Sequence, residues 1–166
     1  MKRLTSLIAT LVALLYGICE YTDIIDYSRS YKAHVVAVVD GDTITVSTRG
    51  AQIKIRLFGV DCPEKLQPYG RAATLLTQKL AYNKEVKITP IQTDRYGRTV
   101  AYVSLPGGNR LNYELVSNGL AWWSKQYAPE EMQLAIRELN ARLKGRGLWQ
   151  DEDPTPPWDF RKGVRH

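Results

Sequence analysis

The sequence contains few cysteines, and this scarcity argues against two classes of protein. Only Cys19 and Cys62 occur among its 166 residues, and Cys19 falls in an N-terminal segment that we expect to lie outside the fold. Cys62 is then the single cysteine of the folded part, which excludes an internal disulfide. It stands between Asp61 and Pro63, and neighbouring carboxylates raise the pKa of a thiol rather than lower it. The sequence therefore argues against a disulfide-stabilised protein and against a thiol nucleophile.

The N-terminal apolar run is short for a membrane-spanning helix. After the basic start MKR, the run LTSLIATLVALLYGI covers residues 4–18, whereas a spanning helix needs about 20 apolar residues. This length fits the core of a signal peptide, although Gly17, Ile18 and Cys19 lack the usual alanine pattern before a cleavage site. We expect residues 1–19 to be a signal peptide, with an uncleaved membrane anchor as the alternative.

Internal repeats are absent, and the first strand-like segments leave no room for crossover helices. Three such segments follow one another with only short turns between them, at 34–40, 44–50 and 53–60. A parallel pair needs a crossover of about a dozen residues, so a doubly wound α/β fold is disfavoured. Later segments have the spacing of a helix at 71–83, strands at 85–90 and 98–105, and helices at 111–119 and after Pro129. This order predicts an α+β fold, mainly β, in which a five-stranded OB-fold barrel carries about three helices.

Composition divides the chain into four parts. We expect segment 1–19 to be followed by a linker at 20–32, one domain at 33–150 and a Pro-rich tail at 151–166. The tail segment DEDPTPPWDF is predicted to be extended, because proline removes a backbone donor and restricts the residue before it. The last helix carries an apolar stripe that we interpret as core, formed by Met132, Ala135, Ile136, Leu139 and Leu143.

Positive charge is in excess along the chain. The formal net charge is +6 at pH 7, from 23 basic and 17 acidic residues. Removal of residues 1–19 would take away Lys2 and Arg3 and no acid, leaving 21 basic residues and a net charge of +4. A basic protein is expected to bind an anionic partner, and charge alone does not distinguish a nucleic acid from a membrane surface.

Four polar or aromatic stretches stand out from the strand and helix pattern. They are DGDT at 40–43, IRLFGVDCPE at 55–64, DRYGR at 94–98, and Trp122-Trp123 followed by Tyr127. Taken alone, each has an ordinary structural explanation: a hairpin turn, a charge on the wet face of a sheet, a polar turn and an aromatic core. Charges that serve solubility alone do not require an arginine and two acids at one strand end.

Taken together and in this order, these stretches closely resemble the staphylococcal (micrococcal) nuclease family, also called thermonucleases. The resemblance rests on VVDGDTITV, IRLFGVDCPE, QPYG, DRYGRTVAYV and NYELVSNGLAWW, between His34 and Trp149. The PPWDFR tail is similar to that of exported bacterial members. The resemblance implies a Ca²⁺-dependent phosphodiesterase that acts on DNA and RNA, in which water attacks phosphorus, the 5′-oxygen leaves and 3′-phosphate products form.

The resemblance also implies roles for individual residues. The expected catalytic residues are Arg56, Glu64 and Arg98; the expected metal ligands are Asp42, Asp61 and the backbone carbonyl of Cys62; the expected substrate contacts are Arg95, Tyr96 and Tyr127. Arg95 replaces a lysine, and Lys125 replaces a second stacking tyrosine. These departures bear on base preference and on contacts to the leaving side, not on the chemistry.

The chemistry of a phosphodiester supports the same set of residues independently. Its transition state gathers negative charge on the non-bridging oxygens, and the planar fork of an arginine holds two such oxygens while staying charged. A hard cation held by carboxylates neutralises further charge and lowers the pKa of bound water. Glu64 can then orient or deprotonate the attacking water, and the sequence leaves both roles open.

Two other functions stay open from the sequence. A non-catalytic OB-type module binds single strands through charge and stacking, although degenerate nuclease domains of that kind lose the metal acids or the arginines, and here all are present. A membrane-tethered interaction protein would rest on residues 4–18 alone. We expect a monomer with DNA and RNA substrates and no protein partner, exported from the cytoplasm or anchored with its domain outside it.

Overall fold

The structure, a computed structural model, describes residues 30–164. The predictions for residues 1–19 and for most of the linker lie outside the described residues. Strand β1 begins at Tyr31, inside the segment predicted to be linker. Between residues 30 and 164, no helix has the length and apolar character needed to cross a membrane.

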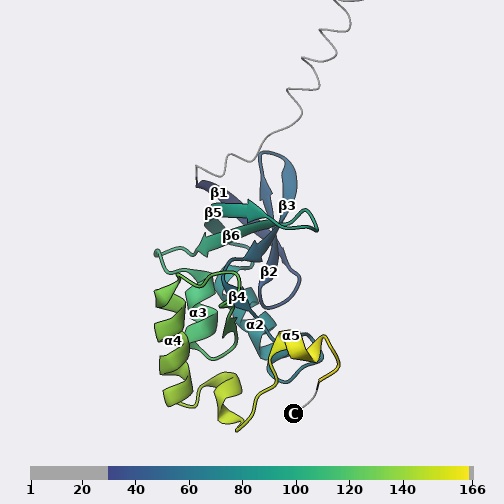
Figure 1. Cartoon of the computed structure of the whole chain (residues 1–166). Helices are drawn as coiled ribbons and strands as arrows, with labels where there is room; N and C mark the ends of the chain where they lie inside the picture. Colours follow the sequence, from purple (N-terminus) through teal and green to yellow (C-terminus); the bar gives the residue numbers. More distant parts are fainter. Residues whose placement is uncertain (1–29, 165–166) are drawn as a thin grey trace, which may run out of the picture.

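A closed five-stranded barrel forms the core of the fold (Figure 1). Its strands are β1 (Tyr31–Val38), β2 (Thr43–Thr48), β3 (Ala51–Leu57), β5 (Glu85–Thr93) and β6 (Thr99–Ser104), in the spatial order β1-β2-β3-β6-β5. The first three strands form the expected antiparallel meander, and β3 pairs with β6 in parallel. Side chains such as Val35, Ile44 and Ile55 point inward and are fully buried. The predicted fold class is confirmed.

Helices and a small second sheet gather at one end of the barrel (Figure 1). The helices are α2 (Gly70–Ala81), α3 (Leu111–Ser117), α4 (Met132–Leu143) and α5 (Pro157–Phe160), with a 3₁₀ turn at Gly147–Gln150. The second sheet pairs β4 (Val60–Asp61) with β7 (Trp122–Trp123). Asn112 ties α3 to the barrel, because its buried side chain accepts from the Val103 N–H at 3.1 Å and donates to the Phe58 carbonyl at 2.8 Å. The bond to Phe58 holds the chain at the point where β3 leads into β4.

The prediction that the segment after Trp149 is extended throughout is wrong, because α5 lies within it. Pro156 is extended, with φ −67° and ψ 149°, and Pro157 is the first residue of the helix. At that position proline loses no hydrogen bond, and its fixed φ already suits a helix. The Pro-Pro pair therefore starts a helix instead of preventing one.

The interpretation of the apolar stripe on α4 as core is also wrong. Met132 is 61% exposed and Leu143 is 76% exposed, whereas Leu134, Glu138 and Ala141 form the buried face. Glu138 is buried because its carboxylate accepts from the Trp123 backbone N–H at 3.3 Å. The helix thus buries a face that hydrophobic periodicity does not predict.

Candidate active site

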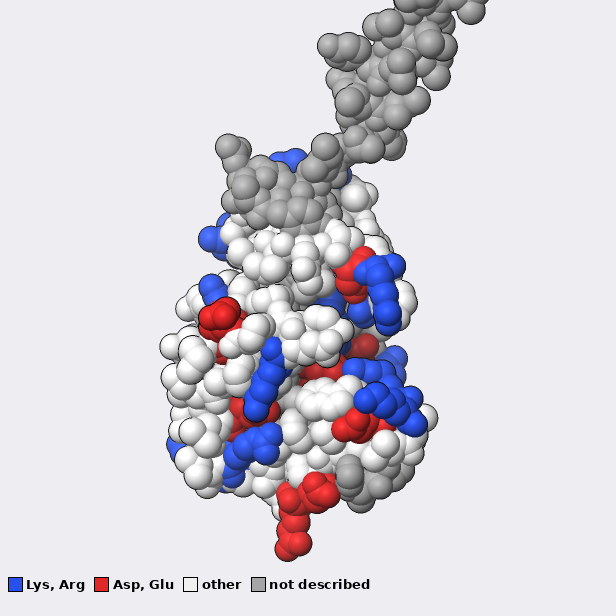
Figure 2. All heavy atoms as spheres, in the orientation of Figure 1, with Lys and Arg blue, Asp and Glu red and all other residues white. Residues whose placement is uncertain are grey.

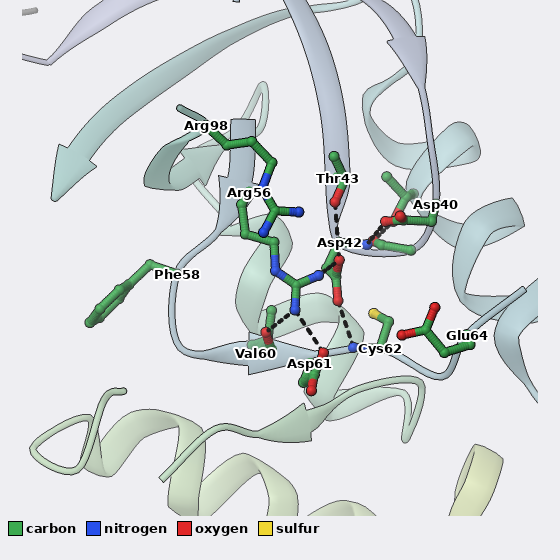
Figure 3. Close-up of polar contacts among 12 residues, drawn as sticks. Asp40, Asp42, Thr43, Arg56, Phe58, Val60, Asp61, Cys62, Glu64 and Arg98 are labelled. Atoms are coloured by element: carbon green, nitrogen blue, oxygen red, sulfur yellow. Dashed lines mark hydrogen bonds and ion pairs between the residues drawn. The ribbon is translucent and has the colours of Figure 1, made fainter. Parts of the chain in front are cut away.

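Two buried carboxylates and one arginine form the centre of the candidate site (Figure 3). Asp42 ends the loop between β1 and β2 and is 2% exposed, and Asp61 lies in β4 and is 6% exposed. Arg56, on β3, forms ion pairs with both acids: its Nη1 with Asp42 Oδ1, and its Nη2 with Asp61 Oδ1 at 2.7 Å. The backbone pairing of Thr43 with Arg56 and of Trp122 with Asp61 sets these positions. The structure therefore brings both predicted acidic metal ligands to one predicted phosphate-binding arginine.

The loop that carries Asp42 is held by hydrogen bonds and by close packing. Asp42 Oδ2 accepts from the Cys62 backbone N–H at 2.6 Å, which links the two predicted metal-binding stretches. The Thr77 hydroxyl on α2 donates to the Gly41 carbonyl at 2.5 Å. A Cβ at Gly41 would lie 2.7 Å from the Ala73 Cβ and 2.8 Å from the Cys62 Sγ. Gly41 is thus required for close approach to α2 and to Cys62, a reason that the turn propensity of Asp-Gly does not reveal.

Glu64 follows β4 in a loop that is organised by Gln67. The Glu64 N–H donates to Gln67 Oε1 at 3.1 Å, and the Gln67 N–H donates to the Glu64 carbonyl at 2.9 Å. Helix α2 begins directly against this loop, since a Cβ at Gly70 would collide with the Glu64 carbonyl oxygen. Gln67 is a positioning residue that sequence reasoning missed, although it belongs to the QPYG stretch of the family resemblance.

Arg98 comes from the turn between β5 and β6 and is oriented by Asp94. Asp94 Oδ2 accepts from Arg98 Nε at 2.7 Å, and Oδ1 accepts from the backbone N–H groups of Tyr96 and Arg98 at 2.9 and 3.0 Å. Partial burial alone would raise the pKa of the Asp94 carboxyl, but these hydrogen bonds outweigh it and lower the pKa below its usual value. The Arg98 side chain extends toward the region of Arg56 and Asp42 (Figure 3).

The predicted substrate contacts fall in two places. Tyr127 is exposed at a cavity of about 320 Å³ that reaches Asp61 and is also lined by Lys125. Arg95 and Tyr96 lie in the β5–β6 turn, where the Arg95 guanidinium carbon is 4.8 Å from the centroid of the Tyr96 ring. Within the described part of the chain, no hydrogen bond or ion pair joins the side chains of Arg95 and Tyr96 to Asp42 or Asp61.

The side chain of Cys62 is buried beneath the carboxylates and is 4% exposed. This burial raises the pKa of the thiol well above its usual range. A thiol that stays protonated is a poor nucleophile. The geometry therefore agrees with the sequence argument against a catalytic cysteine and leaves the backbone carbonyl as the group predicted to bind metal.

The oxygen donors of the site suit a hard cation. Ca²⁺ prefers carboxylate and carbonyl oxygens, and buried carboxylates such as Asp42 and Asp61 need a compensating positive charge. Two guanidinium groups supply that charge here, one from Arg56 and one from Arg161. Among residues 30–164, no three His, Cys, Asp or Glu side chains lie close enough to hold a metal by themselves. The Cys62 carbonyl and water would therefore have to complete the coordination of a cation.

Arg161 is a site residue that the sequence analysis missed. Its Nη2 lies 2.8 Å from Asp61 Oδ2, and its Nη1 lies 2.7 Å from Glu64 Oε1. These contacts join residues 100 and 97 positions apart in the chain. No local pattern signals such a pair. Figure 2 shows basic and acidic side chains lying against one another on this face of the molecule.

Comparisons with known proteins identify the family. Residues 54–151 match the family described as "Staphylococcal nuclease homologue". A protein of Escherichia coli O157:H7 named "Uncharacterized endonuclease" is 43% identical over 127 residues, or 76% of this chain and 82% of that protein. A protein of Shigella flexneri named "Micrococcal nuclease" is 33% identical over 168 residues, or 96% of this chain and 92% of that protein. This chain therefore belongs to the staphylococcal nuclease family.

Proposed function

We propose that this protein is a Ca²⁺-dependent nuclease that hydrolyses phosphodiester bonds of DNA and RNA. The observation that carries the proposal is the convergence of Asp42, Asp61 and Arg56, two buried acids and one arginine from three different elements. Relatives named as an endonuclease and as a micrococcal nuclease support the reaction class. The net positive charge favours a polyanionic substrate.

Arg56 and Arg98 bind the scissile phosphate in this proposal. Each carries a planar guanidinium that can bind phosphate oxygens. Asp94 holds the Nε of Arg98, and Asp42 and Asp61 hold the two Nη groups of Arg56, so carboxylates fix both side chains before substrate arrives. Preorganised donors of this kind stabilise charge that grows in the transition state. Tyr127, at the mouth of the cavity beside Asp61, offers a ring for stacking against a base.

Asp42, Asp61 and the Cys62 carbonyl would hold Ca²⁺, which when bound neutralises phosphate charge and lowers the pKa of water. Glu64 orients the attacking water or accepts its proton, on a loop that Gln67 holds in place. The water oxygen forms a bond to phosphorus and the bond from phosphorus to the 5′-oxygen breaks. The proton of the attacking water goes to Glu64 or to solvent, the 5′-oxygen takes up a proton from solvent water, and the phosphate stays on the 3′ side.

We also propose that the domain works outside the cytoplasm, with residues 1–19 as a cleaved signal or an anchor. The support is the apolar run at residues 4–18 behind a basic start. N-terminal sequencing of the protein from fractionated cells tests this directly. A chain that keeps its first residues and stays in the cytoplasm would contradict it.

Plasmid digestion in Ca²⁺ or in chelator, followed by end-group analysis, tests the activity. We expect cleavage with added Ca²⁺, none in chelator, and 3′-phosphate ends. Mg²⁺ should support the reaction poorly, because it keeps its waters and demands near-ideal octahedral geometry. Full activity in chelator would contradict the metal assignment, and oligonucleotide binding without any cleavage would favour the non-catalytic module.

A further inference from the structure

The C-terminal segment 151–164 is folded against the candidate site. The side chain of Gln67, which organises the Glu64 loop, donates to the Thr155 carbonyl. The Trp158 ring on α5 packs edge-on against the Trp122 ring, with centroids 5.5 Å apart. Trp122 in turn pairs with Asp61 across the second sheet. The segment thus rests on the same elements that position the two acids.

This docking delivers the Arg161 guanidinium, one residue after α5, to the two acids. Arg161 Nη2 is 2.8 Å from Asp61 Oδ2, and Nη1 is 2.7 Å from Glu64 Oε1 and 3.4 Å from Asp61 Oδ1. In the proposed function, Asp61 holds the cation and Glu64 handles the attacking water. Arg161 therefore occupies the oxygens of two groups that the reaction needs.

We propose that the C-terminal segment is a displaceable cap on the active site, in which the Arg161 guanidinium competes with the divalent cation for Asp61 and with the attacking water for Glu64. The proposal rests on the proposed function. A divalent cation at Asp61 repels both guanidinium groups that pair with this carboxylate. Arg161 is the one that can move out into solvent, because its side chain is 47% exposed and that of Arg56 is 21% exposed. Because the Asp61 side chain is 8% exposed, it needs a positive charge beside it, and a divalent cation can supply that charge in place of Arg161.

Calorimetric titration of the full chain with Ca²⁺, without substrate, tests the competition. Arg161→Gln should bind Ca²⁺ about tenfold more tightly than the wild type, since two partly exposed ion pairs no longer oppose binding. Lys162→Gln is the matched control, because it also removes one positive charge and lies next to Arg161 in the chain. The Lys162 side chain pairs with Asp159 and is 71% exposed. The control should change the affinity less than about twofold.

Hydrogen exchange measures displacement of the segment without reference to activity. In the wild type, Ca²⁺ should speed exchange of the backbone amides around α5, whereas in Arg161→Gln these amides should exchange faster already without Ca²⁺. Trp158→Ala, which removes the packing on Trp122, should tighten Ca²⁺ binding in the same direction. This second variant tests the cap even if Arg161→Gln perturbs the local fold.

Unchanged Ca²⁺ affinity in Arg161→Gln would overturn the cap. Weaker affinity would also overturn it and would make Arg161 a group that supports the loaded site. Failure of the proposed function looks different: neither the wild type nor Arg161→Gln would bind Ca²⁺, and the wild type would not cleave plasmid in its presence. Wild-type cleavage in Ca²⁺ together with equal Ca²⁺ affinities would remove the cap alone.

Discussion

Arg56 and Arg161 bind the same carboxylate from two very different parts of the molecule. Arg56 projects outward from β3, a strand of the closed barrel, and its side chain is 21% exposed. Arg161 follows a four-residue helix near the end of the described chain, and its side chain is 47% exposed. Both nitrogen–oxygen distances to Asp61 are short, at 2.7 and 2.8 Å. The difference lies in what holds each arginine, which suits the first to a fixed role and the second to a displaceable one.

Replacing the fixed arginine should have the largest effect. Arg56→Lys keeps the charge but loses the bidentate fork, so we expect kcat to fall by at least about 100-fold, in line with loss of one preorganised donor. Affinity for a single-stranded oligonucleotide should change far less, because other basic groups and aromatic rings remain. Lys54→Gln, an exposed position on the same strand, is the control and should leave kcat unchanged. Lost affinity with no turnover to lose would instead indicate a binding module.

Disturbing the packing of the loop that carries Asp42 should have the second largest effect. Gly41→Ala places a methyl group 2.7 Å from the Ala73 Cβ and 2.8 Å from the Cys62 Sγ. We expect the free energy of unfolding to fall by about 1–3 kcal/mol, the usual cost of overpacking. Urea unfolding checks this. Stability equal to that of the wild type would show that the loop carrying Asp42 can yield, and that Arg56 is not held in a fixed position by this acid.

Loosening Arg98 should have a smaller effect. Asp94→Asn removes the carboxylate that orients its guanidinium, so we expect kcat to fall by about tenfold through misplacement of the donor. The pKa of Asp94 is lowered in the folded state, so its contribution to stability is present above the ordinary carboxyl pKa of about 3.9.

That contribution is lost as the pH falls through the lowered folded pKa. The stability difference between the wild type and Asp94→Asn should therefore persist at pH 7 and shrink in acid. Thermal unfolding across this pH range measures it. A difference that grows in acid would contradict the assignment.

Replacing the buried thiol should have the smallest effect. Cys62 offers its backbone carbonyl to the proposed metal site, so Cys62→Ser should keep kcat within about threefold, although a buried hydroxyl costs some stability. Thiol alkylation should act only through added bulk. A Cys62→Ser protein that folds normally but lacks activity would support the hypothesis that the thiol is a nucleophile.

The first strands of the barrel could be predicted because their signals are local, whereas the acids of the site were singled out by the family resemblance. The alternation around Ile53 and Ile55 defines β3, and short turns leave the first three strands no topology but a meander. The strand ends then place Arg56 beside Asp42 and Asp61. The fold class follows from these patterns, whereas the roles of the site residues stay predictions.

Two of the misses share one physical cause, which is contact between distant parts of the chain. Glu138 lies on the buried face of α4, where it accepts from the Trp123 backbone N–H, and the apolar stripe of the helix faces solvent. Arg161 reaches Asp61 across 100 positions. The helix that begins at Pro157 is a local miss, because proline suits the first position of a helix although it opposes a helix interior.

The aromatic contacts of Trp122 give the molecule an optical reporter of its own. The Trp122 ring lies 4.4 Å from the Trp149 centroid and 5.5 Å from the Trp158 centroid, each at a steep angle. Indoles at such distances couple their electronic transitions and give strong near-ultraviolet circular dichroism. Departure of Trp158 would change that signal and the tryptophan emission together. A rapid-mixing experiment with Ca²⁺ and the natural residues can therefore measure the rate at which the proposed cap is displaced, with no attached dye.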